Sequence, residues 1–330
     1  MKTTAELIEL VGIGQQALDT AIKTEDQLST YKKILVPISG GSDSDIMLDL
    51  VERLGYAGEV VYVFYNTGLE YQATRDHIKE LEGRYGITIL ERPAKVPIPV
   101  SCKKYGQPFL SKKVSDYIER LQRHNFCWTD EPFDTLYARY PRCRAALRWW
   151  CNCFGLDGGD SRFNIERHKW LKEFMIANPP RFRISPKCCD GAKKSVGDGV
   201  IAELSPDLLM VGVRKAEGGA RATAYSSCFT PASETKVSQF RPLFYWRNAD
   251  KQEYEAHCGL CHSDCYTVYG LKRTGCACCP FGRDFEEELA VAERYEPLLA
   301  IAANNIFGES YDYTRRYRAF AAEMEGQNGR

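Results

Sequence analysis

The chain has 330 residues, long enough for about two domains and for a hydrophobic core that needs no disulfide bonds. Its 44 basic and 44 acidic residues balance, so no bulk electrostatic field marks nucleic acid or an anionic membrane as its partner. No apolar run approaches the ~20 residues of a membrane span, and we expect a cytoplasmic protein that has no membrane partner. In that reducing compartment its 14 cysteines serve metal binding or catalysis rather than cross-linking.

The N-terminal residues 5–22 carry apolar side chains at helical spacing and predict one helix with a buried face. Glutamates interrupt this segment, so it does not resemble a signal peptide. Gly12, Gly14 and Ala17 match a loose dinucleotide-binding pattern, but no strand precedes them. We therefore do not expect a dinucleotide site here.

From residue 33 onward, short β-branched runs alternate with amphipathic segments. This alternation predicts an α/β fold with a doubly wound, mostly parallel sheet and helices on both faces. Ligands of such sheets bind at the carboxyl ends of the strands. The expected strands are 32–39, 59–66, 87–91 and 208–214, and the expected helices are 45–55 and 71–86.

Three regions follow from this pattern: an N-terminal helix (1–30), a nucleotide-binding α/β domain (31–250), and a cysteine-rich, helical C-terminal region (251–330). The α/β domain contains an insertion at about 92–183 without clean periodicity. Within this insertion, residues 139–150 mix arginines with aromatic residues. They fit either a nucleic-acid-binding face or, as we favour, a helix with tryptophans in the core and arginines outside. The residues concerned are Arg139, Tyr140, Arg142, Arg144, Arg148, Trp149 and Trp150.

A Ser-Gly-Gly-Ser-Asp-Ser segment lies between the first expected strand and the following helix. Two glycines allow a tight turn, and the N–H groups and hydroxyls at a helix N-terminus favour an anion. The segment lacks the lysine of the nucleoside-triphosphatase P-loop. We expect it to bind a phosphate or pyrophosphate group, although a simple helix-capping turn has the same pattern. The loop residues are Ser39, Gly40, Gly41, Ser42, Asp43 and Ser44.

This loop resembles the SGGxDS loop of the PP-loop ATP pyrophosphatase superfamily, whose fold is adenine nucleotide alpha hydrolase-like. Residues 65–71, YNTGLEY, resemble the NTGxEF segment of the phosphoadenylylsulfate (PAPS) reductase branch, and residues 212–221 resemble its G-x-R-x-x-E-x-x-R segment. The resemblance implies that Ser39 to Ser44 cradle the pyrophosphate, with Asp43 near Mg²⁺. It further implies an adenosine site and a phosphate clamp, formed by Asn66, Thr67 and Gly68 and by Gly212, Arg214, Glu217 and Arg221.

Cys188 and Cys189 are adjacent, and a disulfide between them is disfavoured because neighbouring Cα atoms lie ~3.8 Å apart while relaxed disulfides need roughly 4.4–6.8 Å. Far along the chain, Gly-Cys-x-x-Cys-Pro contains Cys276 and Cys279. The two pairs resemble the [4Fe-4S] set of the iron-sulfur adenylylsulfate reductases, which implies that these four cysteines hold one cluster. Adjacent cysteines suit two corners of a cluster better than one zinc ion, but zinc and buried free thiols remain alternatives.

A second cysteine group, Cys258, Cys261 and Cys265, has ligand-like spacing, with His257 and His262 beside it. It could hold a second metal, or its thiols could be redox-active or structural. We expect the remaining cysteines, among them Cys102 and Cys228, to be core residues.

Two departures from the reductase pattern bear on function. Ser42 stands where the reductase loop usually has lysine, and the C-terminal tail contains no cysteine to attack sulfate sulfur. The chain therefore looks more like the sulfotransferase-like relatives and the DNA phosphorothioation enzymes. That resemblance implies an ATP-dependent, adenylylating sulfur transfer with ATP, Mg²⁺ and a [4Fe-4S] cluster, and we expect a sulfur-donor protein as partner. A nucleic-acid acceptor is suggested only by residues 139–150. A sulfonucleotide reductase and a non-catalytic iron-sulfur or nucleic-acid-binding module are the alternatives.

Overall fold

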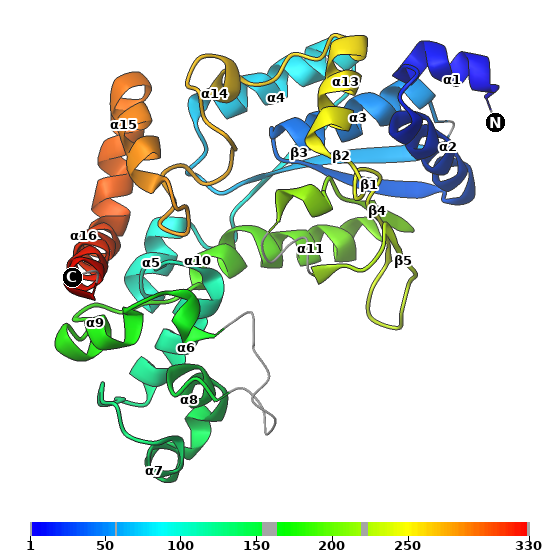
Figure 1. Ribbon diagram of the computed structural model, residues 1–330. Helices are drawn as coiled ribbons and strands as arrows, with labels where there is room; N and C mark the ends of the chain where they lie inside the picture. The colour runs from blue at the N-terminus through cyan, green and yellow to red at the C-terminus, as the bar shows by residue number, and fades with distance from the viewer. Residues whose placement is uncertain (1, 57, 154–163, 219–223, 329–330) are drawn as a thin grey trace. The chain divides into compact units, whose positions relative to one another are not determined.

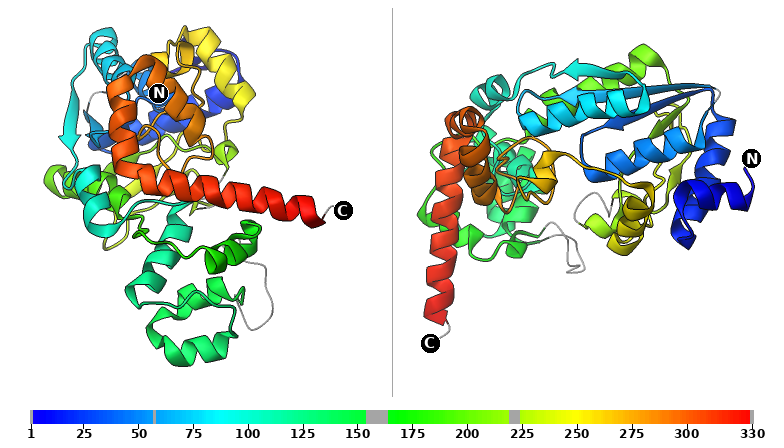
Figure 2. Two further views of the ribbon diagram at one scale, coloured as in Figure 1. Left: turned by 90° about the vertical axis from the view of Figure 1, so that its left-hand side faces the viewer. Right: turned by 90° about the horizontal axis from the view of Figure 1, so that it is seen from above.

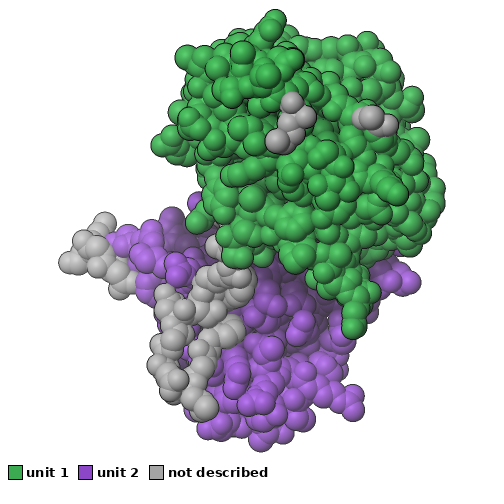
Figure 3. All heavy atoms as spheres, turned by 90° about the vertical axis from the view of Figure 1, so that its right-hand side faces the viewer, with its two compact units in different colours: residues 1–94, 195–276 green, residues 95–194, 277–330 purple. Residues whose placement is uncertain are grey.

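The computed structural model describes residues 2–56, 58–153, 164–218 and 224–328, which form two compact units (Figure 3). Unit 1 comprises residues 1–94 and 195–276, and unit 2 comprises residues 95–194 and 277–330. Each unit is therefore built from two separate segments of the chain.

Unit 1 contains a sheet in which the described residues contribute six strands, in the order β3-β2-β1-β4-β6-β5 (Figure 1). Neighbouring strands are parallel except for β5, which is antiparallel to β6. The strand order changes direction between β1 and β4, which is where sheets of this kind bind ligands. The predicted doubly wound α/β fold is thus confirmed. The strands are β1 (Lys33–Ile38), β2 (Glu59–Asn66), β3 (Ile89–Pro93), β4 (Leu208–Met210), β5 (Phe229–Thr230) and β6 (Ser238–Phe240).

Both faces of this sheet are covered, as the alternation of side chains along β1 requires. Ile34 and Val36 pack into the main core of unit 1, and Leu35 packs on the other face with Val63 and with Val200 of α11. The helices of unit 1 are α1 (Thr4–Val11), α2 (Gln15–Thr30), α3 (Ser42–Leu54), α4 (Gln72–Tyr85), α11 (Ser195–Leu204), α13 (Asn248–Cys258) and α14 (Asp264–Thr267), with a 3₁₀ turn at Lys215–Glu217.

The single N-terminal helix predicted over residues 5–22 is instead two helices, α1 and α2. Gly12 adopts a φ of 88°, which lies outside the helical region, and the N–H of Gly12 still bonds to Ile8. Gly14 is the N-cap of α2. The helical spacing on both sides of this break is similar, so the periodicity alone does not reveal it.

Unit 2 is helical in its described residues and has its own core. Trp149 and Trp150 of α8 are buried there with Phe109, Phe174 and Tyr313. The C-terminal helix α16 appears in Figure 2 as a long helix ending at the C-terminus. The elements are α5 (Ile98–Tyr105), α6 (Lys112–Arg123), α7 (Phe133–Arg139), α8 (Arg144–Trp150), α9 (Leu171–Ala177), α10 (Lys187–Cys189), a π-helical turn (Asp190–Lys194), α15 (Phe285–Tyr295) and α16 (Pro297–Asn328), with 3₁₀ turns at Pro141–Cys143 and Ile165–Arg167.

None of the helices in the described residues is both long enough and apolar enough to cross a membrane.

Candidate functional site

The loop after β1 has the tight turn that its sequence predicts. Gly40 has a φ of 67°, and a Cβ atom there would lie 2.7 Å from the Thr74 side chain. The hydroxyls of Ser39 and Ser44 lie 3.2 Å apart, and each accepts a hydrogen bond from the N–H of Gly41, at 3.3 and 3.2 Å. The loop therefore gathers backbone N–H groups and hydroxyls at the first turn of α3, where the helix dipole favours an anion.

The turn after β2 is organised by a carboxylate. Glu70 is buried and accepts hydrogen bonds from the backbone N–H groups of Thr67 and Gly68 and from the Thr67 hydroxyl. The amide oxygen of Asn66 accepts a further bond from the N–H of Gly68. Sequence reasoning singled out Asn66, Thr67 and Gly68 but missed Glu70, although it lies within the same motif. Because β2 is parallel to β1, this turn lies at the same edge of the sheet as the loop.

The chain after β4 reaches the same edge and contacts the loop directly. A Cβ atom at Gly212 would lie 3.1 Å from the backbone oxygen of Asp43, so only glycine allows this approach without a shift. Arg214 is 7% exposed, and its Nε donates to both carboxylate oxygens of Asp43 at 2.9 Å. The backbone N–H of Arg214 donates to Glu217. The predicted Arg221 lies outside the described residues.

A second cation, which sequence reasoning missed, contacts this loop. Lys251 of α13 donates from Nζ to the Ser42 hydroxyl, and the same Nζ lies 3.1 Å from Oδ1 of Asp43. Arg214 also donates from Nη1 to Asn248, the first residue of α13. No periodicity or motif in the sequence links α13 to the loop.

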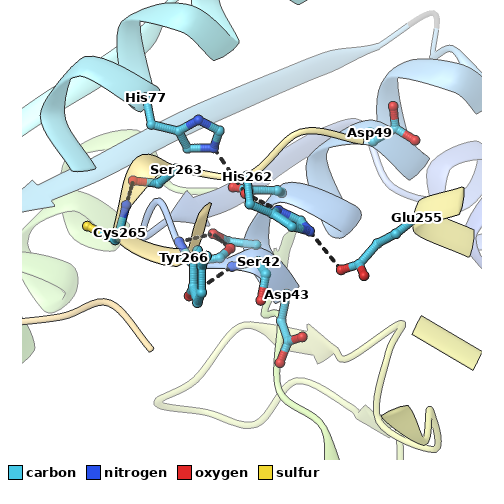
Figure 4. A network of polar contacts seen from close by, with 12 residues as sticks. Ser42, Asp43, Asp49, His77, Glu255, His262, Ser263, Cys265 and Tyr266 are labelled. Atoms are coloured by element: carbon cyan, nitrogen blue, oxygen red, sulfur yellow. Dashed lines mark hydrogen bonds and ion pairs between the residues drawn. The ribbon is translucent and has the colours of Figure 1, made fainter. Parts of the chain in front are cut away.

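Next to the loop, a buried carboxylate joins two histidines. Oδ2 of Asp45 lies 2.7 Å from Nδ1 of His262 and 3.0 Å from Nε2 of His77, and Oδ1 is buried without a hydrogen bond to the described residues. Figure 4 shows His262 joined on its other side to Glu255, with Nε2 and Oε1 2.7 Å apart. His262 was noted in the sequence only as a neighbour of cysteines, whereas its contacts are with carboxylates.

The pKa values of this network follow from its contacts. Burial alone would lower the pKa of His262, but the hydrogen bonds with Asp45 and Glu255 raise it to about 9. His77 likewise has a raised pKa, because its hydrogen bond with Asp45 outweighs burial. Burial alone would raise the pKa of Asp45, but the hydrogen bonds from the two histidines hold it below its usual value. His262 is therefore an imidazolium at neutral pH.

Four cysteines of unit 2 are neighbours. A hydrogen bond with Cys102 is the main reason that the pKa of Cys188 is raised, and Cys189 and Cys279 also act on this thiol. The pKa of Cys189 is raised in turn by its hydrogen bond with Cys188 and by burial. Three of the predicted cluster ligands, Cys188, Cys189 and Cys279, thus lie in one group together with Cys102, which we expected to be a core residue.

The other predicted metal ligands belong to unit 1. The Sγ of Cys276 lies 3.5 Å from the Thr67 hydroxyl, beside the turn after β2. Cys258 and Cys265 are buried against different partners, the backbone oxygen of Leu10 and the Thr74 hydroxyl, and Cys261 is exposed. Within the described ranges, no three or more His, Cys, Asp or Glu side chains are arranged to hold a single metal ion.

The two tryptophans of segment 139–150 are not available for stacking on bases, whereas Tyr140 is half-buried. Trp149 and Trp150 are at most 1% exposed, and the indole N–H of Trp150 donates to the backbone oxygen of Thr129. Arg142 and Arg144 are exposed. The packing that we favoured from the sequence describes this segment.

A cavity of about 320 Å³ lies away from these residues, at the start of β2. Val51, Gly55 and Val60 are among the residues that line it. The Ser39–Ser44 loop follows the end of β1, which is parallel to β2, so the loop and the start of β2 lie at opposite edges of the sheet and the cavity is not part of the candidate site.

Comparisons with known proteins agree with the motifs of unit 1. Residues 33–135 match the model of the phosphoadenosine phosphosulfate reductase domain, which includes the loop and the turn after β2. A search of curated protein sequences finds no match.

Among the solved structures that are similar to this chain are two enzymes. One is the phosphoadenylyl-sulfate reductase from Candida auris in complex with phosphate, with 13% identity, a TM-score of 0.42, and coverage of 80% of this chain and 95% of that one. The other is the U34-tRNA thiolase NcsA from Methanococcus maripaludis with its [4Fe-4S] cluster, with 14% identity, a TM-score of 0.35, and coverage of 97% and 78%. The fold assignment rests on the strand order of this chain itself.

Proposed function

We propose that this chain, whose residues 33–135 match the model of the phosphoadenosine phosphosulfate reductase domain, is an ATP-dependent sulfur-transfer enzyme that cleaves ATP to AMP and pyrophosphate. One observation carries the proposal. At the edge of the sheet where β1 and β4 end, the Ser39–Ser44 loop lies against the backbone of Gly212 and beside the Arg214 guanidinium. The turn at Asn66–Gly68 lies at the same edge and would provide a neighbouring place for the adenosine.

In the proposed first step, an oxygen of the acceptor attacks the α-phosphorus of ATP. The bond from this phosphorus to the bridging oxygen breaks, and pyrophosphate leaves with the electron pair. The backbone N–H groups of Gly40 and Gly41 and the hydroxyls of Ser39 and Ser44 would hold the pyrophosphate oxygens. Arg214 would offset the charge that develops on the leaving group. Positioning by these groups supplies most of the rate enhancement.

Mg²⁺ fits this site because Asp43 offers a hard carboxylate donor at the loop, and its side chain is 16% exposed. When bound, Mg²⁺ would neutralise charge on the departing pyrophosphate. The Nε of Arg214 donates to both oxygens of this carboxylate and so fixes its orientation.

In the proposed second step, sulfide displaces AMP from the activated acceptor. A bond forms between sulfur and the acceptor atom that carried the activated oxygen, the bond from that atom to the oxygen breaks, and AMP leaves with this oxygen and the electron pair. A sulfur-donor protein supplies the sulfide. The crowded sulfurs of Cys188, Cys189 and Cys279 fit a [4Fe-4S] cluster in donor type, and such a cluster would hold or deliver sulfide.

The test is a product analysis with anaerobically purified protein, ATP, Mg²⁺, sulfide, and total RNA or genomic DNA as acceptor. We expect AMP and pyrophosphate in equal amounts and sulfur incorporation into one of the two nucleic acids. Asp43→Asn should abolish both products, while exposed Lys23→Met should retain them. Wild-type protein that binds no adenine nucleotide would overturn the proposal.

The match to the reductase domain favours one alternative, the reduction of a sulfonucleotide. The same preparation, given phosphoadenylyl sulfate and a thiol donor without ATP, separates the two functions. Release of sulfite would support the reductase, and its absence together with AMP formation from ATP would support sulfur transfer.

A further inference from the structure

The Ser39–Ser44 loop has no positive side chain of its own. Residues 39–44 contribute hydroxyls, glycine N–H groups and the negative Asp43. A pyrophosphate group carries several negative charges, and a carboxylate beside it repels them. Apart from the Mg²⁺ proposed at Asp43, any positive charge that the protein itself offers a nucleotide here must therefore come from other parts of unit 1.

Lys251 is placed to supply such a charge. It lies in the first turn of α13, about 210 residues along the chain from the loop, and its side chain is 16% exposed. Its Nζ donates to the hydroxyl of Ser42 and lies 3.1 Å from Asp43. The ammonium group thus contacts the first two residues of α3, where a phosphate would meet the helix N-terminus.

An ion pair with Asp43 does not by itself explain this arrangement, because Asp43 already has a cation. The Nε of Arg214 lies 2.9 Å from both of its carboxylate oxygens. Arg214 and Lys251 thus place two positive charges beside Asp43, and the other carboxylate near Lys251, that of Glu255 at 3.6 Å, is also paired with His262. A phosphate oxygen can replace Asp43 as the partner of Lys251. The Asp43 carboxylate then remains paired with Arg214, so binding of the ligand leaves neither charged group without a partner.

A second bridge between α13 and α3 fixes the position of Lys251. Glu255, one turn further along α13, pairs with His262, and His262 pairs with the buried Asp45 of α3 (Figure 4). Glu255 also lies 3.6 Å from the Nζ of Lys251. Tyr266 adds a contact from the same segment as His262, since its hydroxyl accepts a hydrogen bond from the N–H of Ser42.

We infer that Lys251 is a phosphate-binding residue of this site, and that Glu255 and His262 are positioning residues that hold it at the loop. The inference rests on the proposed function, because it takes the ligand to be the phosphate chain of an adenine nucleotide. The cation that the loop lacks is thus supplied by a helix distant in the sequence.

The test is calorimetric titration of Lys251→Met with four probes: ATP, inorganic pyrophosphate, AMP and adenosine. A charge-assisted hydrogen bond of the usual strength predicts about tenfold to a hundredfold weaker binding of ATP and pyrophosphate. Adenosine binding should change little, because it has no phosphate. Lys23→Met, an exposed lysine on α2, is the matched control and should bind all four probes as the wild type does.

The variant Lys251→Arg tests whether weaker binding results from the lost positive charge or from a disturbed fold. It keeps a cation, and we expect it to recover most of the affinity for pyrophosphate while its thermal unfolding stays near that of the wild type. Glu255→Gln should weaken pyrophosphate binding less than Lys251→Met, since it removes only positioning. If Lys251→Met does not fold, the comparison of Lys251→Arg with Glu255→Gln still tests the inference.

The outcomes distinguish the inference from the proposed function. Wild-type protein that binds ATP, with Lys251→Met binding it equally well, would overturn the inference and leave the function intact. Equal losses for adenosine and pyrophosphate would also overturn it, because they would indicate a structural role. Wild-type protein that binds pyrophosphate through Lys251 but prefers no adenine compound would contradict the function and retain the lysine assignment.

Discussion

At the scale of single residues, the polar network beside the loop depends on the protonation of His262. Its imidazolium lies between two carboxylates, Asp45 and Glu255, and Asp45 has a second histidine partner in His77. The raised pKa of His262 means that the folded state binds this proton more tightly than the unfolded chain does.

We predict that the protein loses stability as the pH rises from 6.5 toward 9. The contribution of His262 is complete below its unfolded pKa of 6.5 and disappears as the pH passes its folded pKa of about 9. Denaturant unfolding at several pH values measures this slope. His262→Gln keeps a side chain that can form hydrogen bonds but does not titrate, and it should flatten the slope in this window; an unchanged slope would assign it to other groups.

At the scale of elements, helix α8 shows how the sequence pattern should be read. Its two tryptophans are buried, while Arg144 is exposed and Arg148 is half-buried, so the tryptophan face of the helix belongs to the core of unit 2. The ring of Trp150 also lies 5.3 Å from that of Trp128 and 5.6 Å from that of Phe126, centroid to centroid. These contacts give the aromatic residues a structural role.

Trp150→Ala should lower the free energy of unfolding by about 3–5 kcal/mol, the usual cost of removing a buried large aromatic side chain. Arg142→Ala, at an exposed position close by, should change it by no more than about 0.5 kcal/mol. Denaturant titration followed by circular dichroism measures both. A Trp150→Ala protein of normal stability that has lost nucleic-acid binding would contradict the packing interpretation.

At the scale of the whole molecule, the two cysteine pairs come from distant parts of the chain. Cys188, Cys189 and Cys279 belong to unit 2 together with Cys102, and Cys276 is the last residue of unit 1. Iron binds cysteine as the thiolate. Because the pKa values of Cys188 and Cys189 are raised, both are thiols when no cluster is bound, and cluster binding must release their protons. The cluster remains a prediction that metal analysis tests.

Anaerobically purified protein should contain about four irons per chain and no stoichiometric zinc, the content of one [4Fe-4S] cluster. Cys188→Ser and Cys279→Ser should lower the iron content, while Cys127→Ser, an exposed cysteine, should not. The single variants Cys102→Ser and Cys276→Ser are then compared. The fourth ligand is the residue whose replacement lowers the iron content of the protein. Wild-type protein that contains only zinc would contradict the cluster.

The sequence alone determined the features that depend on residues close together in the chain. The strand, glycine turn and helix around Ser39–Ser44 are local, because backbone freedom and helix capping act over a few residues. The turn at Asn66–Gly68 and the alternation of strands and helices were predicted for the same reason. The break between α1 and α2 was missed because similar periodicity continues on both sides of two glycines.

Only the tertiary structure decided which distant residues meet at these local features. Lys251 contacts the loop from about 210 residues away along the chain. His262 forms a hydrogen bond with Asp45, and the thiol of Cys102 forms a hydrogen bond with that of Cys188. None of these pairs has a spacing that a helix or strand period could reveal, because the contacts depend on how helices pack on a sheet rather than on the order of residues. The packing of α13 on α3 therefore gives the loop a positive charge that its own six residues lack.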